Sequence, residues 1–197
     1  MKTFIRRGAV LYRILRAAVL LFALLYLACL AYTVWVAAAP ADSFRMGAQG
    51  DTARVCFDRS PVQFAAVMPG LSASAARDIS PKTAHLAMLA ETLAVSLPLA
   101  FCQLWLVFRV LSSIVSGGSP FTFQNVRRIR MLGFAVVGGA VLPKAVRCLI
   151  YALLSGQAGS VPLGEVVTPL AAGLLLLVLA QVFEYGCALQ RAQDETV

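Results

Sequence analysis

The sequence predicts an all-α integral membrane protein, with four transmembrane helices in a bundle and a larger extracytoplasmic loop between helices 1 and 2. Composition is the first indication, because 60% of the 197 residues are hydrophobic and only 13% are charged. A soluble domain averages roughly 45–50% apolar and about 25% charged residues. The apolar residues also form four long blocks, with basic residues in short segments beside them. We therefore expect one integral membrane domain over residues 1–197.

The four apolar blocks give the predicted spans, each long enough to cross ~30 Å of hydrocarbon. The first block, residues 17–39, follows a basic segment and so resembles a secretory signal. Its apolar run exceeds the roughly 7–15 residues of a signal core, which favours an uncleaved first span. The other blocks are residues 84–115, 131–154 and 166–189. Pro98 lies inside the second block and predicts a kink there, which neighbouring helices can accommodate.

The extracytoplasmic loop, residues 40–83, is the only extended polar region of the sequence. It carries a near-balanced mixture of acidic and basic residues. The segments ARVCF and VQFAAVM are rich in strand-forming residues and flank the turn-forming sequence DRSP. This pattern predicts a short hairpin within the loop.

The distribution of basic residues predicts the orientation of the spans. The N-terminal segment carries Lys2, Arg6, Arg7, Arg13 and Arg16, and the connection between the second and third spans carries Arg127, Arg128 and Arg130. The connection between the third and fourth spans has neither Lys nor Arg. Short cytoplasmic segments carry the Lys and Arg excess of membrane proteins. Both termini are therefore expected to be cytoplasmic.

The net charge of +8 has the same explanation. Orientation and contact with anionic lipid account for basic residues beside apolar blocks. Direct nucleic-acid binding is not expected, because no recognised reading motif accompanies them.

The segment between the second and third spans reads SGGSPFTFQNVRRIR. Paired glycines end the second helix in this interpretation, and Thr122 is the predicted N-cap of the next one. Phe121 and Val126 stand at the positions of a hydrophobic staple. The three arginines then fall on the first turns of a helix, where they oppose the helix dipole. Their position must be favoured by something other than helix stability.

Charged residues at membrane depth are functional candidates. Glu91, Lys144 and Arg147 are predicted to form one polar layer, in which Glu91 meets Arg147 or Lys144. Lys144, Arg147 and Tyr151 share a helix face by their spacing. Glu184 lies near the inner end of its span, within reach of the cytoplasmic arginines. The layer is interpreted either as an ion pair that fixes packing or as a cavity for an anionic or amphipathic ligand.

A weaker polar stripe on the second span is expected to carry interhelical hydrogen bonds. It consists of His85, Thr92, Ser96 and Gln103.

No catalytic constellation is present in the sequence. It contains no G-x-S-x-G, no phosphate-cradling glycine loop and no H-E-x-x-H. His85 is the only histidine, which excludes a histidine-based metal cluster. The cysteines show no C-x-x-C pairing and are interpreted as packing residues. The sequence therefore predicts no enzymatic activity, no cofactor and no metal site.

Two segments resemble an uncharacterised family of small bacterial membrane proteins with four spans, the domain of unknown function 2975. They are GSPFTFQNVRRIRMLG and VFEYGCALQRAQDETV. The first signature is carried by Gly118, Pro120, Phe121, Asn125, Arg128 and Arg130. The second is carried by Gly186, Leu189, Gln190, Asp194 and Thr196. The resemblance implies a place in the bacterial inner membrane, but it implies no activity or ligand.

Members of that family are often encoded beside small helix-turn-helix regulators, so the resemblance implies a cytoplasmic transcriptional regulator as partner. Both signature segments are expected on the cytoplasmic side, where the acidic tail can pair with the arginines. The leading hypothesis is a non-enzymatic membrane sensor or anchor for such a regulator, with the signature residues as its docking surface. The alternative is a small transporter or ligand-binding membrane protein that uses the polar layer. The sequence does not determine the oligomeric state.

Overall fold

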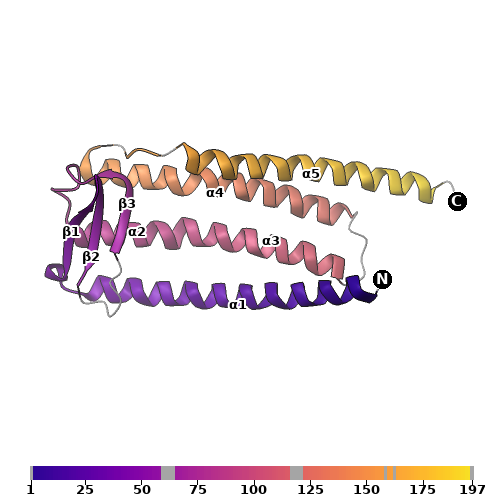
Figure 1. Ribbon diagram of the computed structural model, residues 1–197, viewed down its shortest axis with the longest axis horizontal. Coiled ribbons are helices and arrows are strands. Elements are labelled where there is room, and N and C mark those ends of the chain that lie inside the picture. Colours follow the sequence, from indigo (N-terminus) through magenta and orange to yellow (C-terminus); the bar gives the residue numbers. More distant parts are fainter. Residues whose placement is uncertain (1, 59–64, 116–121, 158, 162, 196–197) are drawn as a thin grey trace. The chain divides into compact units, whose positions relative to one another are not determined.

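The computed structural model describes residues 2–58, 65–115, 122–157, 159–161 and 163–195 (Figure 1). In chain order the elements are α1 (Lys2–Ala38), the 3₁₀ turn η1 (Ala41–Ser43), β1 (Phe44–Gln49), β2 (Thr52–Phe57), β3 (Ala65–Ser72), α2 (Pro81–Glu91), the π-helical turn η2 (Thr92–Ser96), α3 (Leu97–Val115), α4 (Phe123–Ser155) and α5 (Gly164–Asp194). The chain divides into two compact units. Residues 1–25, 98–140 and 167–197 form unit 1, and residues 26–97 and 141–166 form unit 2.

Four helical stretches among the described residues are long and apolar enough to cross a membrane. They are Tyr12–Ala38, Pro81–Val115, Phe123–Ser155 and Gly164–Gln193. Many of their leucines are exposed, with Leu21 and Leu175 each 69% exposed. Exposing so many apolar side chains to water would be energetically unfavourable. Each such side chain gains about 1.5–3 kcal/mol when it leaves water for an apolar phase. The mostly helical architecture with four apolar helices, expected of a multi-pass membrane protein, is thus confirmed.

A three-stranded antiparallel sheet, in the order β1-β2-β3, lies in the loop between the first two apolar helices. The prediction of an all-helical chain with a short hairpin therefore understated the sheet. β2 and β3 are the two strands that the sequence indicated, and Val55 lies opposite Ala66. β1 was missed because its sequence, FRMGAQ, contains no β-branched residue and only its first residue, Phe44, is buried. Residues 59–64, which hold most of the predicted DRSP turn, lie outside the described residues.

The core of unit 2 joins the sheet to the ends of three helices. Alternate residues of β2 point inward, and Ala53, Val55 and Phe57 are buried. Buried residues from α1, β3, α2 and α4 complete the cluster, among them Val36, Met68, Ala84 and Tyr151. One face of the sheet thus packs on helices, as is usual for antiparallel sheets. Figure 1 shows the strands beside the start of α2.

The ends of α1 and α2 within unit 2 are tied together by one lysine. Lys82 Nζ donates hydrogen bonds to the carbonyl oxygens of Ala37 at 2.8 Å and Ala39 at 2.6 Å. These carbonyls lie at the C-terminus of α1, where a cation also interacts favourably with the helix dipole. The charge of Lys82 is therefore used in holding the start of α2 against α1.

The second apolar helix changes its winding beside Pro98. The π-helical turn η2 separates α2 from α3, and Pro98 is the second residue of α3. Pro98 has no N–H to donate to the carbonyl four residues earlier, so the regular hydrogen-bond ladder is interrupted at this point. The predicted irregularity at Pro98 is thus a widened turn, of a kind often found at functional sites.

In unit 1, helices approach one another at glycines. A Cβ built on Gly133 of α4 would meet the carbonyl oxygen of Gly173 of α5 at 3.1 Å, and the converse distance is also 3.1 Å. Small residues at such crossings let helix backbones come close. Aromatic rings contribute as well, since Tyr12 of α1 stacks on Phe108 of α3 with centroids 5.2 Å apart.

Residues 159–161 run against β3 in unit 2. Ser160 N donates a hydrogen bond to the carbonyl oxygen of Gly70 at 2.9 Å. Gly70 has φ +84°, and a Cβ there would collide with the carbonyl oxygen of Ser160. The contact between β3 and the segment that follows α4 therefore requires glycine at this position.

We expect Gly70→Ala to lower the melting temperature of the detergent-solubilised protein by more than Gly50→Ala does. Both glycines have positive φ, and a left-handed non-glycine residue costs about 1–2 kcal/mol. Only Gly70 adds a backbone collision, because a Cβ on Gly50 meets nothing within 4 Å. Thermal unfolding followed by circular dichroism measures the difference. Equal shifts for the two variants would show that residues 159–161 do not dock on β3.

Candidate binding sites

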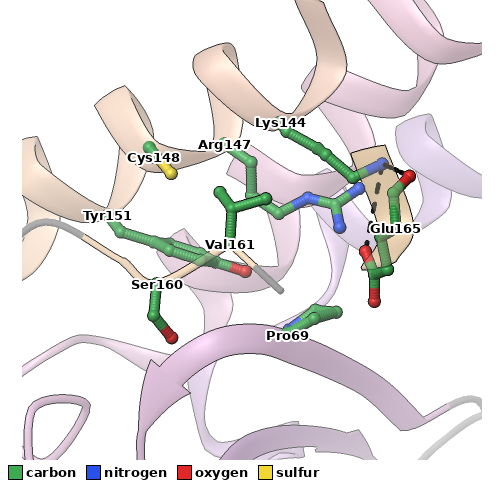
Figure 2. A pocket seen from close by; sticks show the side chains of 8 residues that line it. All are labelled: Pro69, Lys144, Arg147, Cys148, Tyr151, Ser160, Val161 and Glu165. Atoms are coloured by element: carbon green, nitrogen blue, oxygen red, sulfur yellow. Dashed lines mark hydrogen bonds and ion pairs between the residues drawn. The ribbon is translucent and has the colours of Figure 1, made fainter. Parts of the chain in front are cut away.

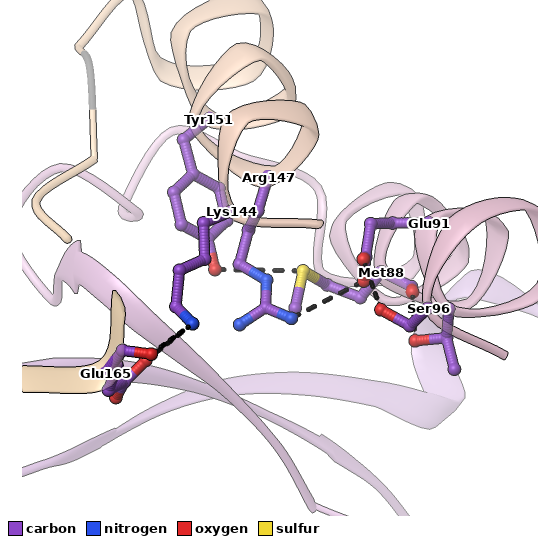
Figure 3. A network of polar contacts seen from close by, with 8 residues as sticks. Met88, Glu91, Ser96, Lys144, Arg147, Tyr151 and Glu165 are labelled. Carbon is purple, nitrogen blue, oxygen red and sulfur yellow. Dashed lines mark hydrogen bonds and ion pairs between the residues drawn. The ribbon is translucent and has the colours of Figure 1, made fainter. Parts of the chain in front are cut away.

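Glu91 and Arg147, two members of the predicted polar layer, meet in unit 2 (Figure 3). Arg147 Nη2 lies 3.5 Å from Glu91 Oε2, and Ser96 Oγ donates to the other carboxylate oxygen at 2.7 Å. The Glu91 side chain is fully buried, whereas that of Arg147 is 24% exposed. A buried carboxylate needs such partners, since an unpaired charge is costly to remove from water. The π turn η2 begins immediately after Glu91 and places Ser96 within reach of it.

Lys144 belongs to a different pair. Its Nζ donates to the backbone carbonyl of Glu165 at 2.9 Å and lies 3.9 Å from the carboxylate of the same residue. Sequence reasoning missed Glu165 because it assigned this residue to a short connecting loop. The sequence feature that could have indicated Glu165 is its position just before the fourth apolar block. In the structure this position lies beside Lys144.

A pocket opens beside these pairs, with about 250 Å³ of free space that includes the solvent at its mouth (Figure 2). Its lining comes from β3, α4, the segment after α4 and the start of α5, and consists of Pro69, Lys144, Arg147, Cys148, Tyr151, Ser160, Val161 and Glu165. Glu91 is not among these residues. The pocket therefore does not lie between the second and third spans, where the ligand-binding alternative expected a cavity.

Arg147 has hydrogen-bonding capacity left in this pocket. Its Nε is buried and has no hydrogen-bond partner in the described part of the chain. Tyr151 forms the apolar floor: it is 1% exposed and its hydroxyl lies 3.7 Å from Met88 Sδ. The spacing that placed Lys144, Arg147 and Tyr151 on one helix face thus corresponds to one wall of the pocket.

The polar stripe of the second span divides among several partners. His85 Nε2 and Tyr32 Oη are 3.2 Å apart, which links α2 to α1 in unit 2. In unit 1, Gln103 Nε2 donates to the carbonyl of Ala135 on α4 at 2.9 Å. Thr92 donates to a carbonyl of its own helix. Two of the four residues therefore bond to another helix as expected, and Ser96 bonds to Glu91.

The start of α4, in unit 1, holds the first signature segment. Thr122 Oγ1 accepts a hydrogen bond from the backbone N–H of Asn125 at 3.3 Å, as the predicted N-cap requires. Asn125 is fully buried, and its Oδ1 accepts from Arg128 Nη1 at 3.1 Å. The same Nη1 lies 3.2 Å from the carbonyl of Arg109 on α3. Asn125 and Arg128 therefore fix the corner between α3 and α4.

The other basic residues of this region lie at the surface. Arg130 Nη2 donates to Glu184 Oε2 at 2.6 Å, and both side chains are about half exposed. The guanidinium of Arg191 stacks over the ring of Phe123 at 4.4 Å from its centroid. Arg127 is exposed as well. We define Arg127, Arg130 and Arg191 as the basic surface.

The remaining signature residues are less informative. Gly118, Pro120, Phe121 and Thr196 lie outside the described residues, and the side chain of Asp194 is not described. Gly186 is half-buried, and Gln190 is exposed. The arginines' acidic partner on α5 is Glu184, which the sequence placed within reach of them.

No group of three or more potential metal ligands occurs in the described ranges. All five cysteines are free thiols.

Comparison with known proteins identifies one family. Its model, described as a protein of unknown function (DUF2975), matches residues 65–197. Neither the curated proteins nor the solved structures contain a match to the chain. The matched region begins at β3 and includes both signature segments together with every residue that lines the pocket.

Replacing either partner of the Glu91–Arg147 pair is expected to destabilise the protein by about 1–3 kcal/mol, because the remaining group stays buried without its partner. The double variant Glu91→Gln/Arg147→Gln should lose less than the sum of the single losses. Denaturant unfolding in detergent measures the three free energies.

The matched control is the exposed pair Arg45–Asp58, whose atoms lie 2.8 Å apart. Arg45→Gln should cost only about 0–1 kcal/mol, because exposed ion pairs contribute little. Strict additivity of the Glu91 and Arg147 losses would mean that these two side chains do not interact.

Proposed function

Because the chain belongs to the family described as a protein of unknown function, DUF2975, we propose that it is a non-enzymatic sensor or anchor that holds a cytoplasmic regulator at the bacterial inner membrane. In this proposal both termini are cytoplasmic and the three-stranded sheet faces outward. The regulator binds the basic surface formed by Arg127, Arg130 and Arg191. The orientation follows from the excess of basic residues in two segments, one before the apolar run of α1 and one before the apolar run of α4.

The observation that carries the proposal is that the arginines at the start of α4 differ in burial and in bonding. Arg128 is half-buried and bonded to Asn125 and to the carbonyl of Arg109 in α3, so its role is to fix the backbone. Arg127 and Arg130, beside it in the sequence, keep their guanidinium groups at the surface. A fixed corner that presents exposed arginines is suited to recognising an acidic protein surface.

Stability does not account for these exposed arginines. Arg127 and Arg130 are the fifth and eighth residues of α4, beyond the first turn in which the helix dipole acts, so the dipole does not favour them. The Arg130–Glu184 pair is half exposed, and such pairs contribute about 0–1 kcal/mol. Orientation in the membrane explains a positive charge in this region, but Lys would satisfy that requirement equally. The use of arginine alone favours recognition of carboxylates, which arginine binds in a bidentate manner.

The proposal is tested by co-purification of the detergent-solubilised protein with a helix-turn-helix regulator of the kind that the family resemblance implies. We expect the wild type to retain the regulator at low salt and to release it as salt is raised, because exposed charge pairs are screened. The double variant Arg127→Gln/Arg130→Gln should retain several-fold less.

Arg45→Gln removes one exposed arginine from the sheet and serves as the charge control, with retention expected to equal that of the wild type. Arg128→Ala should reduce the amount of regulator retained only in proportion to the amount of folded protein that is lost. If the double variant retains as much regulator as Arg45→Gln does, the basic surface is not the docking site.

A further inference from the structure

The level of the pocket relative to a bilayer follows from the helices that line unit 2. The first turns of α2 and the last turns of α4 pack against the sheet, through Ala84, Ile150 and Tyr151 among others. One face of these turns is thus covered by protein, whereas Leu149 and Leu153 of α4 are exposed. The length of each helix that does not pack against the sheet begins further along it.

Three helices agree on where that length begins. After Glu91, the five residues of η2 and the nineteen of α3 extend ~36 Å, which is enough for ~30 Å of hydrocarbon. The part of α4 before Lys144, about 21 residues, extends ~31 Å. The apolar run of α5 starts directly after Glu165, which Lys144 contacts. These lengths allow Glu91, Lys144 and Glu165 to lie at the edge of the hydrocarbon, where phospholipid head groups are found.

The chemistry of the pocket fits an oxyanion. Two of its three charged lining residues, Lys144 and Arg147, are cationic. The third, Glu165, has a half-exposed side chain whose carboxylate lies 3.9 Å from Lys144 Nζ, a contact that an incoming anion can replace. Glu91 approaches Arg147 only through Nη2, and the buried Nε remains without a partner. A guanidinium and an ammonium side by side suit phosphate oxygens.

The size and walls of the pocket indicate what the oxyanion is attached to. Most of the 250 Å³ is open solvent, and the enclosed volume of about 10 Å³ has room for about one water-sized group. An oxyanion therefore enters only when the Glu165 carboxylate moves aside, and the rest of an amphiphile stays outside the pocket. Pro69, Val161 and the Tyr151 ring provide apolar walls beside the two cations (Figure 2). An acyl chain attached to the bound group can remain in the bilayer.

We propose that Lys144 and Arg147 form a binding site for a phosphate oxyanion, presented by an anionic phospholipid or by free phosphate. Glu165 occupies the site of Lys144 when no ligand is bound. This site is in unit 2 and does not depend on the docking function of the basic surface, which is in unit 1. It gives the protein a ligand on which a sensing role can act.

The test is native mass spectrometry of the intact protein, released from neutral detergent after incubation with phosphatidylglycerol or with phosphatidylcholine. We expect the wild type to retain phosphatidylglycerol in preference to phosphatidylcholine. Lys144→Gln should lower that retention about fivefold, the factor expected for one lysine near an anionic head group. Glu165→Gln should raise it, because the competing carboxylate is removed. Arg45→Gln, an equal change of charge on the exposed sheet, should leave retention unchanged.

A second arm adds inorganic phosphate before the lipid and identifies the source of the oxyanion. Competition by millimolar phosphate shows that the site accepts the free anion, whereas retention unaffected by phosphate shows that it selects the lipid. Arg147→Gln is paired with Glu91→Gln so that no carboxylate is left buried and unpaired. Two results together would overturn the proposal. The first is equal phosphatidylglycerol retention by the wild type, Lys144→Gln and Glu91→Gln/Arg147→Gln. The second is that phosphate changes the melting temperature of neither the wild type nor Lys144→Gln, or changes both equally.

Discussion

The apolar surface of the four long helices is the constraint on which the rest of the structure depends. Leucines on α1 and α5 are more than half exposed along consecutive turns, which a protein dissolved in water would not sustain. A bilayer removes that cost, and it also requires backbone polar groups to be satisfied within each span. Helices meet this requirement within each span, and the strands of the described residues lie in the segment between the first two apolar helices.

The same constraint explains how the charged residues are arranged. Glu91 is fully buried and is held by Ser96 and Arg147, whereas Lys144 extends to the start of α5. Two cations three residues apart on α4 thus have separate acidic partners, which relieves their mutual repulsion. The two interpretations of the predicted polar layer, a packing ion pair or a ligand cavity, stay predictions that concern different side chains. The Glu91 side resembles a packing interaction, and the Lys144 side opens into the pocket.

The sequence allowed the spans, the N-cap Thr122 and the contact of Glu91 with Arg147 to be anticipated, because apolar blocks, capping residues and helical spacing are local signals. The sheet was only partly anticipated. β2 has a buried residue at every second position, whereas β1 has no β-branched residue and buries only Phe44. The pairing of β1 is therefore determined by β2 and by burial of Phe44 against Phe57. The partner of Lys144 was not anticipated, because it depends on residues 159–161 folding back onto β3 through Gly70. Such a return is a tertiary contact without a local sequence signature.

The most direct test of the account is the orientation of the chain in the membrane. Green fluorescent protein fused after Val197 should fluoresce, because it folds when it is left in the cytoplasm. Alkaline phosphatase inserted at Gly50, an exposed turn between β1 and β2, should be active, because it requires export. A dark C-terminal fusion together with an inactive insertion at Gly50 would contradict the proposed orientation, and with it the outward sheet and the cytoplasmic basic surface.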